Sequence, residues 1–317
     1  MNILEFIRKF PDEASCVNYF KAQKEQAGII CKRCGSTEFY WQKGKLCHEC
    51  RHCHSRQSLR SGTVMENSKL PFRYWLVSMH LLTSTKKTFS TEELRKQLGH
   101  KRYQPIWEMV CKIRDIMGKR DDKYQLSEQI ELDDAFFTTE IPDEKKDEPK
   151  KRGRGSQSKS KVLVMVESKP VDNPKKGQKC KSVHHIKMQI ITDLKSQTIT
   201  DIVKEQVDES AELTTDDSTS YNKLAEHVKL HRASVVSPKM VSVVLPWVHI
   251  VIANAKRLLL DVHHKIKKEY LQYYLNEFCY KFNRRYFGEN IFDRLMLAAV
   301  SYKTEFKSKI YKRTLCG

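Results

Sequence analysis

The sequence predicts a multidomain α+β protein, in which a small cysteine-rich unit and a helical region precede an α/β core. Three observations lead to this expectation. Five of the ten cysteines lie between residues 31 and 53. Apolar residues recur at helical spacing from about residue 73 to about residue 119. Beyond residue 126, three β-type runs precede further helical segments, a pattern typical of an α/β domain.

The length and charge of the chain restrict its class. The 317 residues are enough for two or three folding units, and a hydrophobic fraction of 39% supports packed cores. No window reaches the roughly 18 to 20 apolar residues of a membrane span. The N-terminus lacks the apolar run of a signal peptide, so we expect a soluble, cytoplasmic protein. A net charge of +19 favours nucleic acid as the partner, although a solvated surface or ribosome association would also be basic.

The cysteine spacing predicts a structural zinc site. Cys31 and Cys34 form one C-x2-C pair, and Cys47, Cys50 and Cys53 follow with the same spacing. Two such pairs, roughly 12 to 20 residues apart, place four thiolates around one tetrahedral zinc. The second pair is either Cys47 with Cys50 or Cys50 with Cys53. The segment between the pairs suits a short hairpin, and a ribbon this small depends on its metal to fold.

Helical periodicity predicts a helix-turn-helix-like region. One helix is expected over residues 73–83. A second is expected over 90–100, with Ser90 as its N-cap and Glu93 completing a capping box. A third follows over 103–119. A helix, a tight turn and a helix with a basic surface fit a DNA-binding motif, and an ordinary three-helix packing unit fits equally well.

Strands and a charged insertion are expected in the second half of the chain. Residues 129–137, 161–168 and 186–193 are β-type runs. Residues 141–161 hold no apolar side chain beyond Ile141 and are rich in charge, Gly and Ser, which predicts a flexible insertion. Its basic end either contacts the DNA backbone or is a solvated linker.

Acidic residues lie on or at the ends of these strands. Asp133 and Asp134 fall within the first run, and Asp216 and Asp217 end a short strand before an expected helix. One acidic pair alone is usually a turn cap or a surface charge. A strand Asp, a second Asp 83 residues later and a helix bearing polar groups 33 residues further form the arrangement of RNase H-like nucleases and transposases. Their carboxylates hold two divalent ions about 4 Å apart.

Seven stretches in chain order carry a family resemblance: CRHCHSRQSLRSGTVM, ELRKQLGHKRYQPIWEM, IELDDAFF, KRGRGSQSKSKVLVMVES, DDSTSYNKL, LPWVHIVIANAKRLLL and YLNEFCYKFNRRYFGENIFDRL. Together they resemble bacterial insertion-sequence transposases of the DDE class, in the family with an N-terminal zinc ribbon and an RNase H-like (ISXO-like) core. The resemblance covers nearly the whole chain. It implies Cys50 and Cys53 as the second zinc pair and leaves Cys47 spare.

The resemblance also implies the catalytic residues. Asp133 and Asp216 would be the first two ligands of catalytic Mg²⁺ or Mn²⁺. Asp134 stands where relatives usually have an acidic neighbour. Asp217 stands where many have Gly, so Asp216 is the better candidate of its pair.

The helix over residues 245–260 departs from the family pattern. In many related transposases a Glu precedes a Lys by seven residues, and about 700° of rotation puts both on one face. Counting back from Lys256 gives His249, which is not a carboxylate. His249 would complete the metal site, position water or phosphate, or be a core or capping histidine. Nitrogen suits Mn²⁺ better than Mg²⁺. Asn254 is the alternative third position, although it lies about 200° from Lys256.

Four basic residues are expected to bind phosphate. Lys256 and Arg257 would do so near the metal site, and Arg284 and Arg285 would reach the DNA backbone from the following helix. The expected domains are an N-terminal helix with the zinc ribbon (1–65), the helix-turn-helix-like region (66–125), the RNase H-like core (126–300) and a basic tail (301–317).

The expected function is that of a DNA transposase, a polynucleotidyl transferase that binds the terminal inverted repeats of an insertion sequence and joins them to target DNA. We expect a homodimer on double-stranded DNA, associated with the bacterial nucleoid. One alternative is a catalytically inactive or domesticated DNA-binding relative, because residue 249 is not a carboxylate. Another is a structural or RNA-associated zinc-ribbon protein, which the large α/β region with paired aspartates argues against.

Overall fold

The computed structural model describes residues 1–174, 180–234, 244–263 and 266–306. The chain forms two compact units. The first contains Met1–Arg120 and the chain from Tyr286 onward, and the second is Asp121–Arg285. Within the described ranges, no helix has the length and apolar character needed to cross a membrane.

The first unit combines helices with a small antiparallel sheet. Its helices are α1 (Ile3–Lys9), α2 (Glu13–Gln26), α3 (Phe72–Ser84), α4 (Thr91–Gln97), α5 (Tyr103–Asp121) and α10 (Ile291–Ser301). Its strands are β1 (Phe39–Gln42), β2 (Cys47–Cys50) and β3 (Arg56–Ser58), in that order. The hairpin predicted between the cysteine pairs is confirmed as β1–β2, and the three predicted helices are confirmed as α3, α4 and α5. The capping box of Ser90 and Glu93 is confirmed as well.

Helix α10 belongs to this first unit, which differs from the expected core boundary at residue 300. Its buried Phe292 lies with its ring centroid 5.9 Å from that of Phe6, and α10 packs against α2 and α3. The amide of Val64 donates to the carbonyl of Ala299 at 3.0 Å. The expected domain 1–65 and residues 66–120 of the expected domain 66–125 also lie in this one unit, whose first segment ends at Arg120. An amphipathic helix must bury its apolar face, but its own sequence does not specify against which partner.

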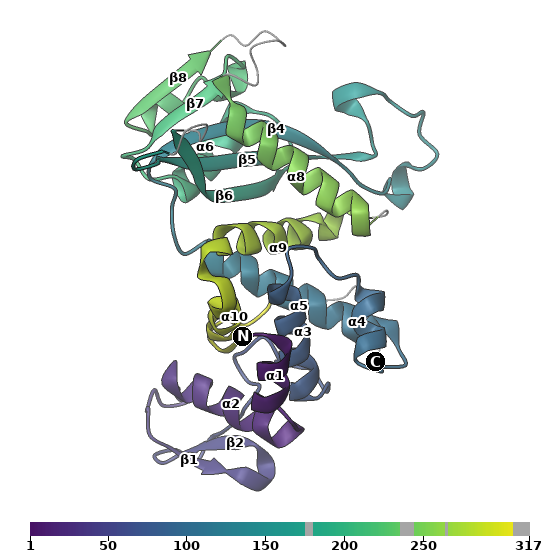
Figure 1. Cartoon of the computed structure of the whole chain (residues 1–317), viewed down its shortest axis with the longest axis vertical. Coiled ribbons are helices and arrows are strands. Elements are labelled where there is room, and N and C mark those ends of the chain that lie inside the picture. The colour runs from purple at the N-terminus through teal and green to yellow at the C-terminus, as the bar shows by residue number, and fades with distance from the viewer. Residues whose placement is uncertain (175–179, 235–243, 264–265, 307–317) are drawn as a thin grey trace. The chain divides into compact units, whose positions relative to one another are not determined.

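The second unit is a mixed five-stranded sheet with helices on both faces, as predicted for an α/β core. Its strands are β4 (Gln129–Thr138), β5 (Lys159–Pro170), β6 (Lys181–Ile191), β7 (Glu212–Asp216) and β8 (Leu230–Ser234), in the order β6-β5-β4-β7-β8. β4, β5 and β6 are antiparallel, and β7 and β8 run parallel to β4. Helix α6 (Ser196–Gln206) packs on one face, and α8 (Pro246–Val262) lies across the other, with α9 (Leu271–Asn283) beside it (Figure 1).

Helix α9 protects the free edge of β6. The side-chain amide of Gln272 donates to the carbonyl of Met188 and accepts from the amide of Ile190, both at 2.9 Å. The amide of Asn283 likewise accepts from the backbone of Ile186 at 2.8 Å and donates to it at 3.0 Å. Two side chains thus pair with the edge as a further strand would, which prevents association with other sheets.

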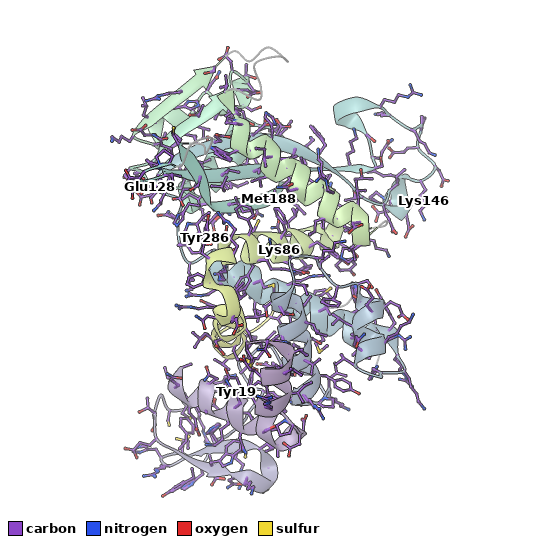
Figure 2. All side chains as sticks on the ribbon, in the orientation of Figure 1. Tyr19, Lys86, Glu128, Lys146, Met188 and Tyr286 are labelled. Atoms are coloured by element: carbon purple, nitrogen blue, oxygen red, sulfur yellow. The ribbon has the colours of Figure 1, made fainter. Side chains whose placement is uncertain are left out.

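The segment between β4 and β5 projects away from the sheet (Figure 1). It contains two 3-10 turns, Asp143–Lys145 and Gly153–Gly155, and Lys146, labelled in Figure 2, pairs with Asp143 at 2.5 Å. The insertion expected over 141–161 is too long, because β5 already begins at Lys159. Ser160 is fully buried, so the polar residues that suggested a loop here are part of the sheet.

The helix expected after Asp217 is also corrected. The chain there forms two 3-10 turns, η4 (Thr219–Tyr221) and η5 (Leu224–Glu226). The hydroxyl of Ser218 accepts from the amide of Ser220 at 3.4 Å and caps only the first of these short turns. Tyr221 and Leu224 are buried in the core beneath α6, so packing ends each turn before a helix can extend.

Candidate active site and cysteine cluster

The two predicted catalytic aspartates lie on neighbouring strands. Asp133 is in the middle of β4, and Asp216 is the last residue of β7. The parallel register pairs Glu131 with Thr214, and two further residues along each strand bring Asp133 level with Asp216. Since side chains alternate along a strand, both carboxylates lie on the same face of the sheet.

Helix α8 crosses this face and brings His249 to Asp133. The Nδ1 atom of His249 lies 3.7 Å from Oδ2 of Asp133. Glu131, two residues before Asp133 on the same face, accepts hydrogen bonds from the amides of Trp247 and Val248, both at 2.8 Å. A carboxylate at this position satisfies amides that have no partner within the helix and holds the first turn of α8 over β4.

Glu131 is a residue of this site that the sequence pattern did not single out. Its side chain is 9% exposed, and it fixes the position of the helix that carries His249. The available signal was an acidic residue two positions before Asp133, on the same face of a strand that is otherwise mostly apolar.

Lys256 follows His249 by two helical turns and shares its face of α8. Its Nζ lies 5.7 Å from the ring centroid of Phe137, further along β4. Burial lowers the pKa of Lys256, the nearby charge of Lys159 lowers it further, and the carboxylate of Asp133 opposes the change. Lys256 therefore lies near Asp133, and Lys159 lies near Lys256. Lys159 was missed because it was assigned to the insertion.

The surroundings of Asp133 disfavour its charge when no cation is bound. Burial raises its pKa to about 7, and the neighbouring charges of Asp134 and Asp216 add to the rise. The amide of Asp134 donates to Oδ1 of Asp133 at 2.8 Å. The Nε2 atom of His249 is buried, and no described group hydrogen-bonds it. Asp216 is near enough for its charge to act on Asp133, and His249 lies beside Asp133, but the ligand atoms of the three residues do not all lie within 4.8 Å of one another. A divalent cation at this site would have to draw these side chains closer together. We call Asp133, Asp216 and His249 the carboxylate site.

Other candidates lie outside this arrangement. Asn254 is exposed and stands about 140° around α8 from His249. Asp134 alternates to the opposite face of β4, and Asp217 is exposed beyond the end of β7. Arg257 is exposed on α8, where its guanidinium is accessible to a phosphate.

The expected phosphate contacts of Arg284 and Arg285 are wrong. Arg284 is buried, pairs with Asp121 and stacks 3.7 Å from the ring centroid of Tyr280. Arg285 donates to three backbone carbonyls, two of them on β6. Both arginines hold α9 in the second unit. Basic residues at the end of a helix look the same in sequence whether they meet phosphate or a buried partner.

The predicted zinc ligands come together in the first unit. The Sγ atoms of Cys31, Cys34, Cys50 and Cys53 lie within 4.8 Å of one another. The Cys31–Cys53 and Cys34–Cys50 sulfur pairs are each 3.5 Å apart. Thiolates bound tetrahedrally about 2.3 Å from zinc are about 3.8 Å apart, so this cysteine cluster fits zinc.

Two equivalent turns build the cysteine cluster. In each, the fourth residue after the first cysteine donates its amide to the carbonyl of that cysteine, at 2.9 Å from Gly35 and 3.1 Å from His54. Both donors have positive φ, 74° and 56°. Following backbone amides lower the pKa of the first cysteine in each turn, to about 6 for Cys31. The second turn therefore starts at Cys50, and Cys47 lies on β2 outside the cluster.

Comparison with known proteins identifies a family. A family model described as "ISXO2-like transposase domain" matches residues 125–283, which include both aspartates and His249. Among solved structures, a crystal structure of a pre-cleavage Mos1 transpososome is similar with a TM-score of 0.26 and 9% sequence identity. That similarity covers 75% of this chain and 82% of the other. Comparison with curated proteins finds no match.

Proposed function

Because the chain belongs to the ISXO2-like transposase family, we propose that it binds the ends of an insertion sequence and catalyses DNA strand cleavage and strand transfer. One observation carries this proposal. Asp133 and Asp216 lie level on adjacent parallel strands, with His249 of α8 at 3.7 Å from Asp133. This is a site for phosphodiester chemistry on a rigid sheet, where its position is set by backbone pairing.

Asp133, Asp216 and His249 are the residues that would hold Mg²⁺ or Mn²⁺. Two such ions, when bound, supply activation of water or of a 3′ hydroxyl and stabilisation of the leaving oxygen. Asp133 would bind a cation as a carboxylate, and that cation would offset the burial and neighbouring negative charge that raise its pKa to about 7. The imidazole of His249 offers nitrogen, which favours Mn²⁺ over Mg²⁺.

The positive side chains beside the carboxylate site would hold the DNA backbone. The charge of Lys159 is near enough to lower the pKa of Lys256, and Arg257 is exposed on the same helix as Lys256. Cationic side chains that neutralise DNA phosphates release the counterions held there, which favours the protein–DNA complex. The affinity for DNA should therefore fall as the salt concentration rises. The net charge of +19 supports the same partner.

The first unit would recognise the terminal inverted repeats. The cysteine cluster would hold a structural zinc that keeps β1–β3 folded, and α4 and α5 would form a helix-turn-helix-like reader. Cleavage at two ends of one element needs two active sites, so we propose a homodimer on DNA that also engages target DNA.

A relative that binds DNA without cutting it is the second candidate, because His249 stands where related transposases have a carboxylate. The test is strand cleavage of labelled DNA that carries the element's own ends, with Mg²⁺ and with Mn²⁺. Nicking at the element boundary that Asp133→Ala and Asp216→Ala abolish, and that Asp217→Ala preserves, would support the proposed chemistry. Specific end binding without cleavage under either metal would favour the second candidate.

A further inference from the structure

A second group of metal-ligand side chains lies on the other face of the same sheet. Glu167 follows Val164, the partner of Asp133 on β5, by three residues and so points to the opposite face. The Nδ1 atoms of His184 and His185 on β6 each lie 2.8 Å from Oε2 of Glu167. Candidate ligand atoms of the three side chains all lie within 4.8 Å of one another.

A β-bulge brings both histidines to Glu167. The register of β5 with β6 shifts between Val166 and Ser168, so that His184 and His185 both stand opposite one residue of β5. On a regular strand two adjacent side chains point to opposite faces. A bulge redirects them, and bulges are common where a side chain must be aimed at a site. The two imidazole rings are 3.8 Å apart between centroids.

The carboxylate of Glu167 is buried but ionised. It is 3% exposed, and Oε1 accepts from the amide of Ser127 at 3.0 Å. Burial alone would raise its pKa, but hydrogen bonds from His185, Ser127 and His184 lower that pKa to about 2. The side chains of His184 and His185 are 36% and 28% exposed, so an ion can reach the group from solvent.

Each histidine contacts Glu167 through Nδ1, which leaves Nε2 of the same ring on its other side. Burial lowers the pKa of His184, and the neighbouring charges of His185 and Lys169 lower it further against the opposing effect of Glu167. A neutral imidazole has a ring nitrogen with a free lone pair for a metal.

We propose that Glu167, His184 and His185 form a second metal site, the His–Glu site, which binds a divalent transition-metal ion of the Zn²⁺ class. Two imidazole nitrogens and one carboxylate oxygen are a known zinc ligand set, with a fourth position left for water. Tetrahedral ligands about 2.1 Å from zinc are about 3.4 Å apart, so the present 2.8 Å contacts widen by roughly half an ångström.

Metal binding at the His–Glu site requires no loss of a proton from Glu167, His184 or His185. Each neutral imidazole moves its proton from Nδ1 to Nε2, and the Nδ1 lone pair then bonds to the ion. The ion joins β6 to β5 beside the bulge, where regular pairing of the two strands is interrupted. This site differs in chemistry from the carboxylate site, which offers mainly oxygen, and from the cysteine cluster, which offers sulfur.

Zinc content per full-length chain tests the proposal. Every chain carries Asp133→Ala, so that the carboxylate site does not contribute, and is prepared without a polyhistidine tag. After equilibration with Zn²⁺ and removal of free ion, this parent should hold two zinc ions per chain. The His184→Ala/His185→Ala variant should hold one. The matched control His227→Ala, a half-buried histidine of the same unit, should hold two.

Cobalt replacement distinguishes the ligands. The first Co²⁺ equivalent should show thiolate charge-transfer absorption from the cysteine cluster, and the second should add only ligand-field bands. One zinc per parent chain, two in the double variant, or thiolate absorption from the second equivalent would overturn the proposal. His184→Gln and His185→Gln, which keep a polar side chain at the bulge, serve if the alanine variant does not fold. Each should still lose the second equivalent.

Discussion

The cysteine cluster and the carboxylate site offer ligands for cations in different ways. Cys31 and Cys53, the first and last ligands of the cluster, are 22 residues apart, and two short turns with matching hydrogen bonds form it. The carboxylate site instead joins β4, β7 and α8, with 83 residues between its aspartates. Local turn geometry sets the first arrangement, whereas strand register and helix docking set the second.

The two sites should therefore depend on their ions to different degrees. The sheet β1–β3 is small, and a metal replaces the hydrophobic core that such a ribbon lacks. The carboxylate site lies on a five-stranded sheet packed beneath α8, with Val162, Val164, Val248 and Val251 in one buried cluster. We therefore expect the cysteine cluster to lose its fold without zinc and the carboxylate site to keep its shape without Mg²⁺ or Mn²⁺.

Zinc removal should have the largest effect. A chelator should unfold β1–β3, because binding of a structural zinc contributes on the order of 10 kcal/mol. The unit Asp121–Arg285 should stay folded. Hydrogen exchange would show complete loss of protection in residues 39–58, whereas the sheet of the second unit would remain protected. Cys34→Ser should reproduce the loss, and Cys47→Ser, outside the cluster, should not. Protection that survives chelation would contradict a zinc-dependent ribbon.

Asp133→Ala should lower the rate of strand cleavage by on the order of 10³-fold, because it removes a cation ligand and a charge that acts in the transition state. The variant should remain folded, since the surrounding sheet does not depend on this side chain. Cleavage of end-bearing DNA with Mn²⁺ measures the change. Asp217→Ala, an exposed neighbour of Asp216, should cleave normally; equal losses in both variants would argue against the assignment.

The pH dependence of stability should reveal the raised pKa of Asp133. That pKa is about 7 in the folded protein and 3.8 as the ordinary value, so the folded state binds the proton more tightly. The resulting stabilisation is complete below pH 4 and is lost as pH rises through 7, by on the order of 2 to 4 kcal/mol. Urea unfolding of metal-free protein at pH 5 and pH 8 measures it. Asp133→Asn should remove this component, and an unchanged slope would contradict it.

Glu131→Gln should destabilise the second unit by about 1 to 2 kcal/mol, because a neutral amide is a weaker acceptor for the first amides of α8 than a carboxylate. Cleavage should fall together with stability, since His249 is carried by that helix. Glu128→Gln is the matched control. Glu128, labelled in Figure 2, makes a surface pair with Lys169 at 3.3 Å, which contributes about 0 to 1 kcal/mol. Equal effects on thermal unfolding would contradict the capping role.

Asn254→Ala should have the smallest effect, a change in cleavage rate within about twofold. Asn254 is exposed, and a surface substitution away from the buried core and the carboxylate site is usually near neutral. His249→Ala should lower the rate by at least about tenfold, with a larger loss in Mn²⁺ than in Mg²⁺. Parallel rates in the two metals measure this contrast. A greater loss at Asn254 than at His249 would reverse the assignment of the third position.

Structures formed by residues close together in the chain could be predicted from the sequence. The spacing of Cys31, Cys34, Cys50 and Cys53 is that of two local turns. The Ser90–Glu93 capping box and the β1–β2 hairpin also form within a few residues of chain. Backbone sterics and hydrogen bonding act at this range, so a pattern of residues specifies the structure.

The packing partners of helices and charged side chains could be seen only in the tertiary structure. Helix α10 packs in the first unit, and Arg284 pairs with buried Asp121 and does not face solvent. Glu131 became a helix cap only when α8 docked on β4, and one extra residue in β6 directed His184 toward Glu167. Apolar faces and charged groups accept many partners of similar energy. The choice among them follows from the packing of the whole chain, which no short pattern encodes.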